Sequence, residues 1–246
     1  MKILIIGSGA VGSIAAKFLA ESTEVEQIIL GDIDLQKAKK FIIPSPKIVF
    51  KTLDARDVNM VAEAAKGTDL IINSSLSVFN TNLLKAALLA KVNYQDFSSD
   101  EWQIEQLKFD GDFKKLGLKA LINASAAPGV TNLITAELAA GLKRIEYIKI
   151  RLLEDVSSDV PFTAWAKSIF FDQIWTKPQT WEFDKAVTKN NFSEEEKYNF
   201  PEPHLNQKCW LLAQEEIGTI PRYIKTKHAD LKAGGSEIEL ARTLLS

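Results

Sequence analysis

Met1–Gly12 reads MKILIIGSGAVG, a short apolar run that passes directly into three glycines spaced G-x-G-x-x-G. Gly7 allows a tight turn at the end of a strand, Gly9 lets a ligand approach the backbone, and Gly12 lets a helix pack closely on that strand. Free amides at the start of the helix favour anionic oxygens. The residues expected to surround a dinucleotide diphosphate are Gly7, Ser8, Gly9, Ala10, Val11 and Gly12.

A glycine motif is weak by itself, so the sequence on either side of it matters. Ile3–Ile6 is a continuous apolar run suited to a strand that is buried on both faces. After the glycines, apolar side chains recur at helical spacing, at Val11, Ile14, Ala15 and Phe18. The flanking sequence therefore predicts the strand before the loop and the helix after it.

The third part of the pattern is an acidic residue after the next strand. Gln27–Leu30 predicts that strand, and Asp32 follows 20 residues after Gly12 (32 minus 12). A carboxylate there binds the hydroxyls of the adenosine ribose and repels a 2′-phosphate, so NAD is the expected cofactor. NADP is the second candidate, because the segment 37–40 contains three lysines. The alternative is a glycine turn without a ligand, in which Asp32 only caps a helix. We assign the capping role to Asp34 instead.

Length and composition describe a globular chain with two modest domains. It has 246 residues, 46% hydrophobic content and a net charge of −2, with both signs interspersed. This balance predicts neither nucleic-acid nor membrane partners. Cys209 is the single cysteine, which excludes an internal disulfide and favours the cytoplasm. With only two histidines, His204 and His228, no metal site is expected.

Strand-like and helix-like segments alternate along the first half, which is typical of a parallel sheet with helices on both faces. Helices are expected over 35–41, 58–65 and 80–90, and further strands over 47–53, 69–73, 92–97 and 118–123.

Polar residues follow several of these strands. Because ligands of such sheets lie at the carboxyl ends of the strands, we expect Asp54 near the adenine, and Asn73 and Ser74 near the nicotinamide ribose or amide. Asp96 is the expected catalytic acid/base, since a partly desolvated carboxylate has a raised pKa. The alternative for each residue is a turn role, in which the side chain bonds the local backbone.

A second landmark is Pro128–Asn132, a break followed by a long apolar helix through Leu142. The start of this helix is expected to bind a substrate carboxylate, with contacts from Gly129 and Asn132. The alternative is a plain turn with a helix cap.

Further along, alternating apolar residues over 148–152 predict a half-buried strand, and 162–174 predicts a helix. Three tryptophans are expected to line either a substrate pocket or the core: Trp165, Trp175 and Trp181. Arg151 and Arg222 are candidates to bind a substrate carboxylate, against salt bridges as the alternative.

These motifs, in this order, resemble the saccharopine dehydrogenase family, which includes saccharopine reductases, carboxynorspermidine synthases and lysine 6-dehydrogenases. The resemblance covers nearly the whole chain, and the glycine loop is its sharpest part. The matching segments are Gly7–Gly12, Asp32–Asp34, Thr52–Asp54, Leu70–Asn73, Val92–Asp96, Pro128–Asn132 and Glu216–Arg222.

The resemblance implies an α/β fold, a Rossmann-type doubly wound parallel sheet with a second, smaller α/β substrate domain. It also implies an NAD(P)-dependent oxidoreductase acting on a CH–NH group of an amino acid derivative or amine. The expected partners are a small-molecule substrate, with Arg222 as the candidate arginine for it, and a second copy of the chain in a homodimer. The expected domains are 1–125 for the dinucleotide, 126–225 for the substrate, and 226–246 as a segment returning to the first domain.

Two features depart from the family pattern. Family members continue beyond a point like Ser246, so the chain is expected to be a shortened member. Gln214 stands where members often carry a histidine, so no role of that histidine transfers to this chain.

A different class of function shares the same first half. A noncatalytic NAD(H)-sensing module would also need the strand, the glycines and the acidic turn. Such a module needs no substrate pocket, so the region 128–222 favours the enzyme.

Overall fold

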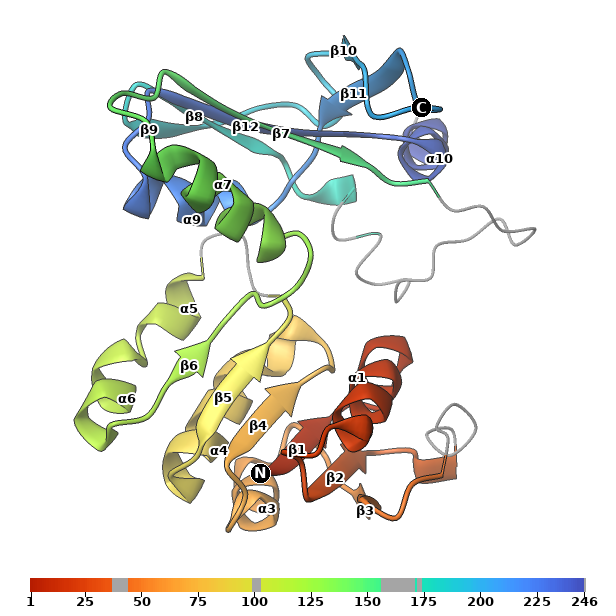
Figure 1. Ribbon diagram of the computed structural model, residues 1–246, viewed down its shortest axis with the longest axis vertical. Coiled ribbons are helices and arrows are strands. Elements are labelled where there is room, and N and C mark those ends of the chain that lie inside the picture. The colour runs from red at the N-terminus through yellow and green to blue at the C-terminus, as the bar shows by residue number, and fades with distance from the viewer. Residues whose placement is uncertain (37–43, 99–102, 156–170, 172–173, 246) are drawn as a thin grey trace. The chain divides into compact units, whose positions relative to one another are not determined.

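The computed structural model describes residues 1–36, 44–98, 103–155, 171 and 174–245. The chain divides into two compact units, Met1–Ser125 and Ala126–Ser246 (Figure 1). Each unit has its own sheet and its own hydrophobic core, so each is described separately.

The first unit is built on a six-stranded sheet in the order β3-β2-β1-β4-β5-β6, in which every pair is parallel. Its strands are β1 (Lys2–Ile6), β2 (Gln27–Asp32), β3 (Ile48–Thr52), β4 (Leu70–Asn73), β5 (Asn93–Asp96) and β6 (Ala120–Leu121). Its α-helices are α1 (Ala10–Glu21), α3 (Val58–Ala65), α4 (Asn80–Ala90), α5 (Ile104–Leu107) and α6 (Asp110–Leu116), and a 3-10 turn, η1, spans Ser77–Phe79. The order reverses between β1 and β4, which is the switch point of a doubly wound sheet.

Both faces of this sheet are covered, because the strand residues are apolar on both sides. Leu4 and Ile6 pack with α3 and α4 in one buried cluster, whereas Ile3 and Ile5 pack with Ala16 of α1 in another. This explains the continuous apolar run of β1. The predicted fold class is confirmed for this unit.

One expectation about α1 needs a correction. The apolar stripe read from the sequence is exposed, at 45% for Val11, 56% for Ile14 and 63% for Phe18. The face turned to the sheet is instead made of small residues, Gly12 and Ala16 among them. Helix α1 lies close to the strands for this reason, and periodicity alone cannot distinguish a small buried face from a large exposed one.

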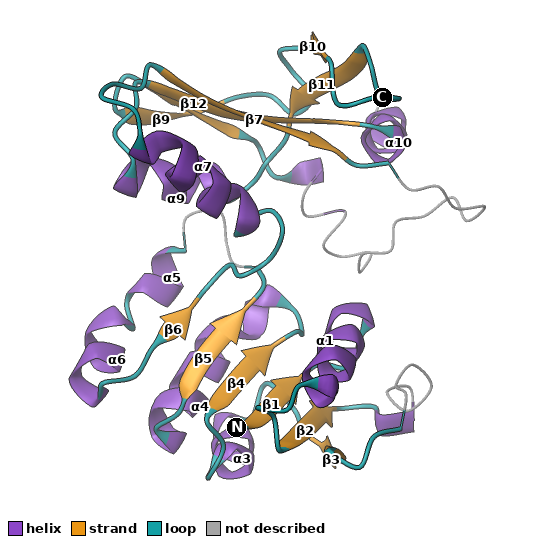
Figure 2. Ribbon diagram, viewed as in Figure 1, coloured by secondary structure: helices purple, strands orange, loops and turns teal. Residues whose placement is uncertain are grey.

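The second unit contains a separate, mostly antiparallel sheet in the order β10-β11-β12-β8-β9, with β7 parallel to β12 (Figure 2). The strands are β7 (Tyr147–Leu153), β8 (Gln179–Glu182), β9 (Lys185–Thr188), β10 (Glu196–Tyr198), β11 (Gln207–Leu211) and β12 (His228–Gly234). Its helices include α7 (Val130–Ala140), α9 (Glu216–Tyr223) and α10 (Ser236–Leu245). Its core joins Ile148, Trp210, Ile217 and Leu231 from different elements.

The expected third segment, 226–246, clusters with the second unit. It forms β12 and α10 of the second unit, and β12 pairs with β7, β8 and β11. The alternating apolar residues of 228–234 are used at the centre of this sheet. Most of the predicted helix over 162–174, including Trp165, lies outside the described residues.

Candidate functional site

The glycine loop after β1 is held by close backbone contacts. Gly7 has φ +96°, and a Cβ there would lie 2.7 Å from the backbone nitrogen of Ser75. A Cβ on Gly12 would collide with the carbonyl oxygen of Gly7 and the hydroxyl of Ser74. These two positions therefore need glycine so that the loop, α1 and the end of β4 can pack together.

Gly9 is different, because the space beside it is open. Among the described residues, no heavy atom outside its immediate neighbours lies within 4 Å of a Cβ built on Gly9. Gly9 is the N-cap of α1. No side chain caps this end of the helix, and the first turn contains no acidic residue. The first turn of α1 and the positive end of its dipole thus lie beside this open position, an arrangement that fits the diphosphate of a dinucleotide.

Asp32 lies beside this loop at the end of β2. Its Oδ2 accepts hydrogen bonds from the backbone nitrogen of Ser8 at 2.8 Å and from the Ser8 hydroxyl at 2.5 Å, and its Oδ1 accepts one from the nitrogen of Asp34 at 3.0 Å. Partial burial opposes ionisation, but the bonds from Asp34 and Ser8 hold the pKa of Asp32 below its ordinary value. Asp32 is therefore ionised at neutral pH, as a partner of ribose hydroxyls must be.

Of the predicted contacts Asn73 and Ser74, Ser74 braces the loop from the β4 side. The Ser74 hydroxyl donates to the carbonyl oxygens of Ile6 and Gly7, at 2.9 and 2.7 Å. Asn73 is buried, and its amide donates to the Asn80 side chain at 2.6 Å. Both side chains lie at the expected edge of the sheet, with their polar atoms engaged inside the protein.

Asp54 follows β3 at the far end of the same edge. Its carboxylate forms an ion pair with Arg56 at 2.6 Å, and this bond lowers the pKa of Asp54. The adenine contact expected for Asp54 stays a prediction.

Asp96 at the end of β5 is fully buried. Its Oδ1 accepts from the backbone nitrogen of Asn123 at 2.8 Å, and its Oδ2 accepts from the Gln106 side chain at 2.5 Å. Burial raises the pKa of Asp96 to about 6, although bonds from Asn123, Tyr94 and Gln106 oppose the rise. The raised pKa is the one the acid/base hypothesis requires, but the carboxylate has no exposed surface.

In the second unit, a hydrogen bond between Gly129 and Asn132 closes the turn at the start of α7. The Gly129 nitrogen donates to Oδ1 of Asn132 at 3.0 Å, and the amide of Asn132 donates to the Thr219 hydroxyl at 2.8 Å. The side chain of Asn132 is therefore engaged between α7 and α9. The structure thus favours the helix-cap alternative for Asn132, and its substrate contact stays a prediction.

Glu216, at the start of α9, is a buried group that sequence reasoning did not single out. Its Oε1 accepts from the Thr131 hydroxyl at 2.6 Å, and burial raises its pKa. Its Oε2 is buried without a hydrogen-bond partner among the described residues. The only signal in the sequence was its place in the segment 216–222, because its partner is far away along the chain.

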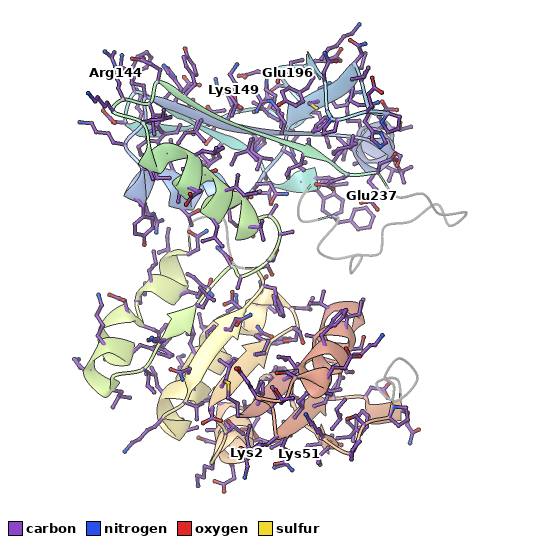
Figure 3. The ribbon with its side chains drawn as sticks, viewed as in Figure 1. Lys2, Lys51, Arg144, Lys149, Glu196 and Glu237 are labelled. Atoms are coloured by element: carbon purple, nitrogen blue, oxygen red, sulfur yellow. The ribbon has the colours of Figure 1, made fainter. Side chains whose placement is uncertain are left out.

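The two candidate arginines occupy different surroundings. Arg151 is buried in the sheet, where it forms ion pairs with Glu196 and Asp230, so the salt-bridge alternative holds for it (Figure 3 labels Glu196). Arg222 lies exposed near the end of α9. Trp181 packs against the core of the second unit, and Trp175 is 63% exposed.

Membrane spans and metal sites are both missing from the part of the chain that the structure describes. No helix in that part combines the length and apolar character needed to cross a membrane. No group of three or more histidine, cysteine, aspartate or glutamate side chains within the same residues is arranged to hold a metal ion.

The sheet order, the open Gly9 position and the ionised Asp32 define a class of protein, the α/β proteins that bind a dinucleotide across the carboxyl edge of a parallel sheet. Residues 3–125 match the family model described as saccharopine dehydrogenase NADP binding domain. The chain belongs to the saccharopine dehydrogenase family, and the resemblance drawn from its motifs is confirmed.

Two relatives share part of the sequence. The chain is 32% identical over 164 residues to carboxyaminopropylagmatine dehydrogenase of Synechocystis sp., covering 61% of this chain and 40% of that protein. It is 30% identical over 171 residues to carboxynorspermidine synthase of Vibrio cholerae, covering 56% of this chain and 39% of that protein. The chain thus spans about two fifths of the length of these relatives.

A solved structure extends the likeness to both units. The apo saccharopine dehydrogenase (L-Glu forming) from Saccharomyces cerevisiae matches with a TM-score of 0.78 at 16% identity, covering 99% of this chain and 57% of that chain. At this identity the match establishes the fold.

Proposed function

We propose that this protein is an NAD(P)-dependent oxidoreductase that transfers a hydride between the nicotinamide and a CH–NH carbon of an amino acid derivative or amine. The observation that carries the proposal is the open Gly9 position at the start of α1, next to the ionised Asp32. Membership of the saccharopine dehydrogenase family supports the reaction class.

The roles in the first unit follow from the sheet order. The half built on β1, β2 and β3 takes the adenosine end, with Asp32 at the ribose, and the half built on β4, β5 and β6 takes the nicotinamide end. Residues 7–12 hold the diphosphate. In this proposal Ser74 supports the nicotinamide half through its bond to the glycine loop, and Asn73 through its bond to Asn80 at the start of α4.

The chemistry divides between cofactor and protein. Bound NAD(P) supplies or takes the hydride. In the oxidative direction the substrate carbon loses a hydride and the nitrogen loses a proton, and the resulting imine adds water and separates into a carbonyl compound and an amine. The chain's own task is to hold the reacting carbon in place and to keep water away until the imine forms.

On the substrate side we propose the first turn of α7 and the guanidinium of Arg222 as positions for a substrate carboxylate. Gly129 and Asn132 shape that turn through the bond between them. An arginine recognises a carboxylate through two parallel hydrogen bonds, which a lysine does not provide. We also propose a cytoplasmic homodimer, which sedimentation of the intact protein tests.

The experiment is a turnover assay with the full chain. NAD⁺ or NADP⁺ is mixed with saccharopine, L-lysine or carboxynorspermidine, and formation of the reduced nicotinamide is followed by its absorbance. We expect turnover with at least one of these amines, and slower turnover with Gly9→Ala at the same subsaturating cofactor concentration. Cofactor binding without amine-dependent turnover would favour the nucleotide-sensing module instead.

A further inference from the structure

The carboxylate of Asp96 joins three elements of the first unit. Besides the bonds to Asn123 and Gln106, the backbone carbonyl of Asp96 accepts from the nitrogen of Ala124 at 2.9 Å. Strand β6 pairs with β5 only at Ala120 and Leu121. Asp96 therefore continues the link between β5 and the β6 segment past the end of the strand, and fastens both to α5.

The chain turns sharply where Asp96 holds it. Asn123 has φ +60°, a left-handed conformation that few residues other than glycine adopt readily. Its side chain is 6% exposed, and neither its oxygen nor its nitrogen has a hydrogen-bond partner within the described residues. Asparagine is among the residues that adopt this conformation most readily after glycine, so the unusual feature is the unsatisfied buried amide. Such an amide destabilises a fold, and each one in a native structure needs an explanation, such as a role at a ligand site.

This corner lies in the nicotinamide half of the sheet. The order β4-β5-β6 places the end of β6 beyond β5, on the side of the switch point opposite to Asp32. Ligands of such sheets lie over the carboxyl ends of the strands, so the corner after β6 borders the place of the nicotinamide ring.

We propose that Asp96 is a positioning residue, which fixes the corner at Asn123 and Ala124 in the shape that receives the nicotinamide ring and does not touch the ligand itself. This rests on the proposed function, because it presumes a pyridine dinucleotide in the first unit. It also replaces the acid/base role, since a carboxylate with no exposed surface and both oxygens hydrogen-bonded has no path to a substrate proton.

The energetics support a role beyond folding. Burial raises the pKa of Asp96 to about 6, so its ionised form at neutral pH destabilises the folded state. An apolar residue would serve a purely structural core better, whereas a carboxylate can accept the backbone amide of a left-handed corner and the Gln106 amide together.

The experiment compares two ligands on the full chain. NADH or NADPH, whichever binds the wild-type protein more tightly, is titrated alongside the matching ADP-ribose or 2′-phospho-ADP-ribose, which lacks the nicotinamide ring. For Asp96→Ala we expect binding of the dinucleotide to weaken about tenfold or more, and binding of the ADP-ribose to change less than about twofold.

Two variants serve as controls. Asp96→Asn keeps one oxygen for the Asn123 nitrogen, and its amide can donate to Oε1 of Gln106, which has no partner among the described residues. We expect this variant to bind both ligands within about threefold of the wild type. Asp110→Asn changes an exposed acid on α6 and should leave both affinities unchanged.

The outcomes distinguish a failure of the positioning role from a failure of the proposed function. Equal weakening of both ligands by Asp96→Ala, or an unchanged dinucleotide affinity in the folded variant, would overturn the positioning role. Failure of the wild-type protein to bind either ligand would instead overturn the proposed function. If Asp96→Ala does not fold, Asp96→Ser, which retains one acceptor oxygen, takes its place, with a selective loss of dinucleotide affinity expected.

Discussion

Gly9 and Gly12 belong to one motif, the first as the N-cap of α1 and the second in its first turn, but they face different constraints. Gly12 has no room for a side chain, because a Cβ would collide with the Gly7 carbonyl, whereas Gly9 has open space beside it. One glycine is therefore needed to build the loop and the other to leave room for a ligand.

The first prediction concerns the stability of the loop. We expect Gly12→Ala to lower the free energy of unfolding by at least about 2 kcal/mol, because the added methyl group must displace backbone atoms. Chemical denaturation measures the change. Gly111→Ala is the matched control, since a Cβ there meets no described atom within 4 Å and alanine stabilises a helix by about 0.5–1 kcal/mol. Equal stability of Gly12→Ala and wild type would show that the packing is not as described.

The second prediction concerns the choice of cofactor. Asp32→Asn removes the negative charge near the ribose but keeps an oxygen for the Ser8 amide. We expect the ratio of NADPH to NADH affinity to rise about tenfold, because the 2′-phosphate no longer meets a carboxylate. Titration of both reduced coenzymes into the wild type and the variant gives the ratio, and an unchanged ratio would remove Asp32 from the cofactor site.

At the scale of elements, two of the family motifs contact each other inside the second unit, Pro128–Asn132 and Glu216–Arg222. The start of α7 contacts the start of α9 through the bond from Thr131 to Glu216 and the bond from Asn132 to Thr219. Glu216 is fully buried and its second oxygen has no partner within the described part of the chain, so the Thr131 hydroxyl is a valuable donor.

The third prediction tests this contact. Thr131→Val preserves the shape of the side chain but removes the donor to Glu216. We expect the second unit to lose about 1–3 kcal/mol of stability, because a buried carboxyl is left unsatisfied. Thr188→Val makes the same change at an exposed position of β9 and should stay within about 0.5 kcal/mol of the wild type. Equal unfolding midpoints for the two variants would argue against the α7–α9 contact.

Helices with local signals were predictable from sequence. The predicted bounds of α3 and α4 agree with the structure, since Asp57 caps α3 through the Met60 nitrogen and the buried residues Leu83, Leu84 and Ala87 of α4 recur at helical spacing. The short helices α5 and α6 were missed, because each offers few apolar residues to set a period. Strand β6 is shorter than predicted, since the chain turns at Asn123 to bond Asp96.

The same distinction between local signals and tertiary packing explains which parts of the candidate site were predictable. The glycine loop was predictable because its spacing between an apolar run and a helical stretch is a local pattern, although Gly7 and Gly12 also pack against the distant Ser74 and Ser75. The link between Thr131 and Glu216 was not, because it joins positions 85 residues apart and exists only after the second unit has folded. Burial of Asp96 beneath α5 also depends on tertiary packing, so sequence placed it at the correct strand end without its surroundings.

At the scale of the whole molecule, the buried Asp96 and the half-buried Glu154 predict how stability depends on pH. Burial raises the pKa of Asp96 to about 6, and burial beside Glu237 raises the pKa of Glu154 to about 7. Their contribution to stability is complete below the pKa values of the unfolded chain, near 4, and is lost as pH rises through the folded values.

The fourth prediction follows from this sign. Between about pH 4.5 and 7.5 we expect each unit to lose stability, on the order of 3 kcal/mol per carboxyl. Asp96→Asn should flatten the pH dependence of the first unit. Glu154→Gln should reduce that of the second unit, to which Glu216 also contributes because burial raises its pKa. Thermal unfolding across this range measures the slopes, with Asp110→Asn as an exposed control. Stability that rises with pH in the wild type would contradict the assignment.

The central claim is that the loop at residues 7–12 binds the diphosphate of a pyridine dinucleotide. Calorimetric titration of NADH and NADPH into the folded full chain tests it most directly, with Gly9→Ala as the partner measurement, because the added methyl group occupies the open space without disturbing the loop. We predict saturable binding of at least one coenzyme to the wild type, and binding about tenfold weaker or more to Gly9→Ala at equal stability. Absence of saturable binding of both coenzymes to the folded wild-type protein would contradict the account.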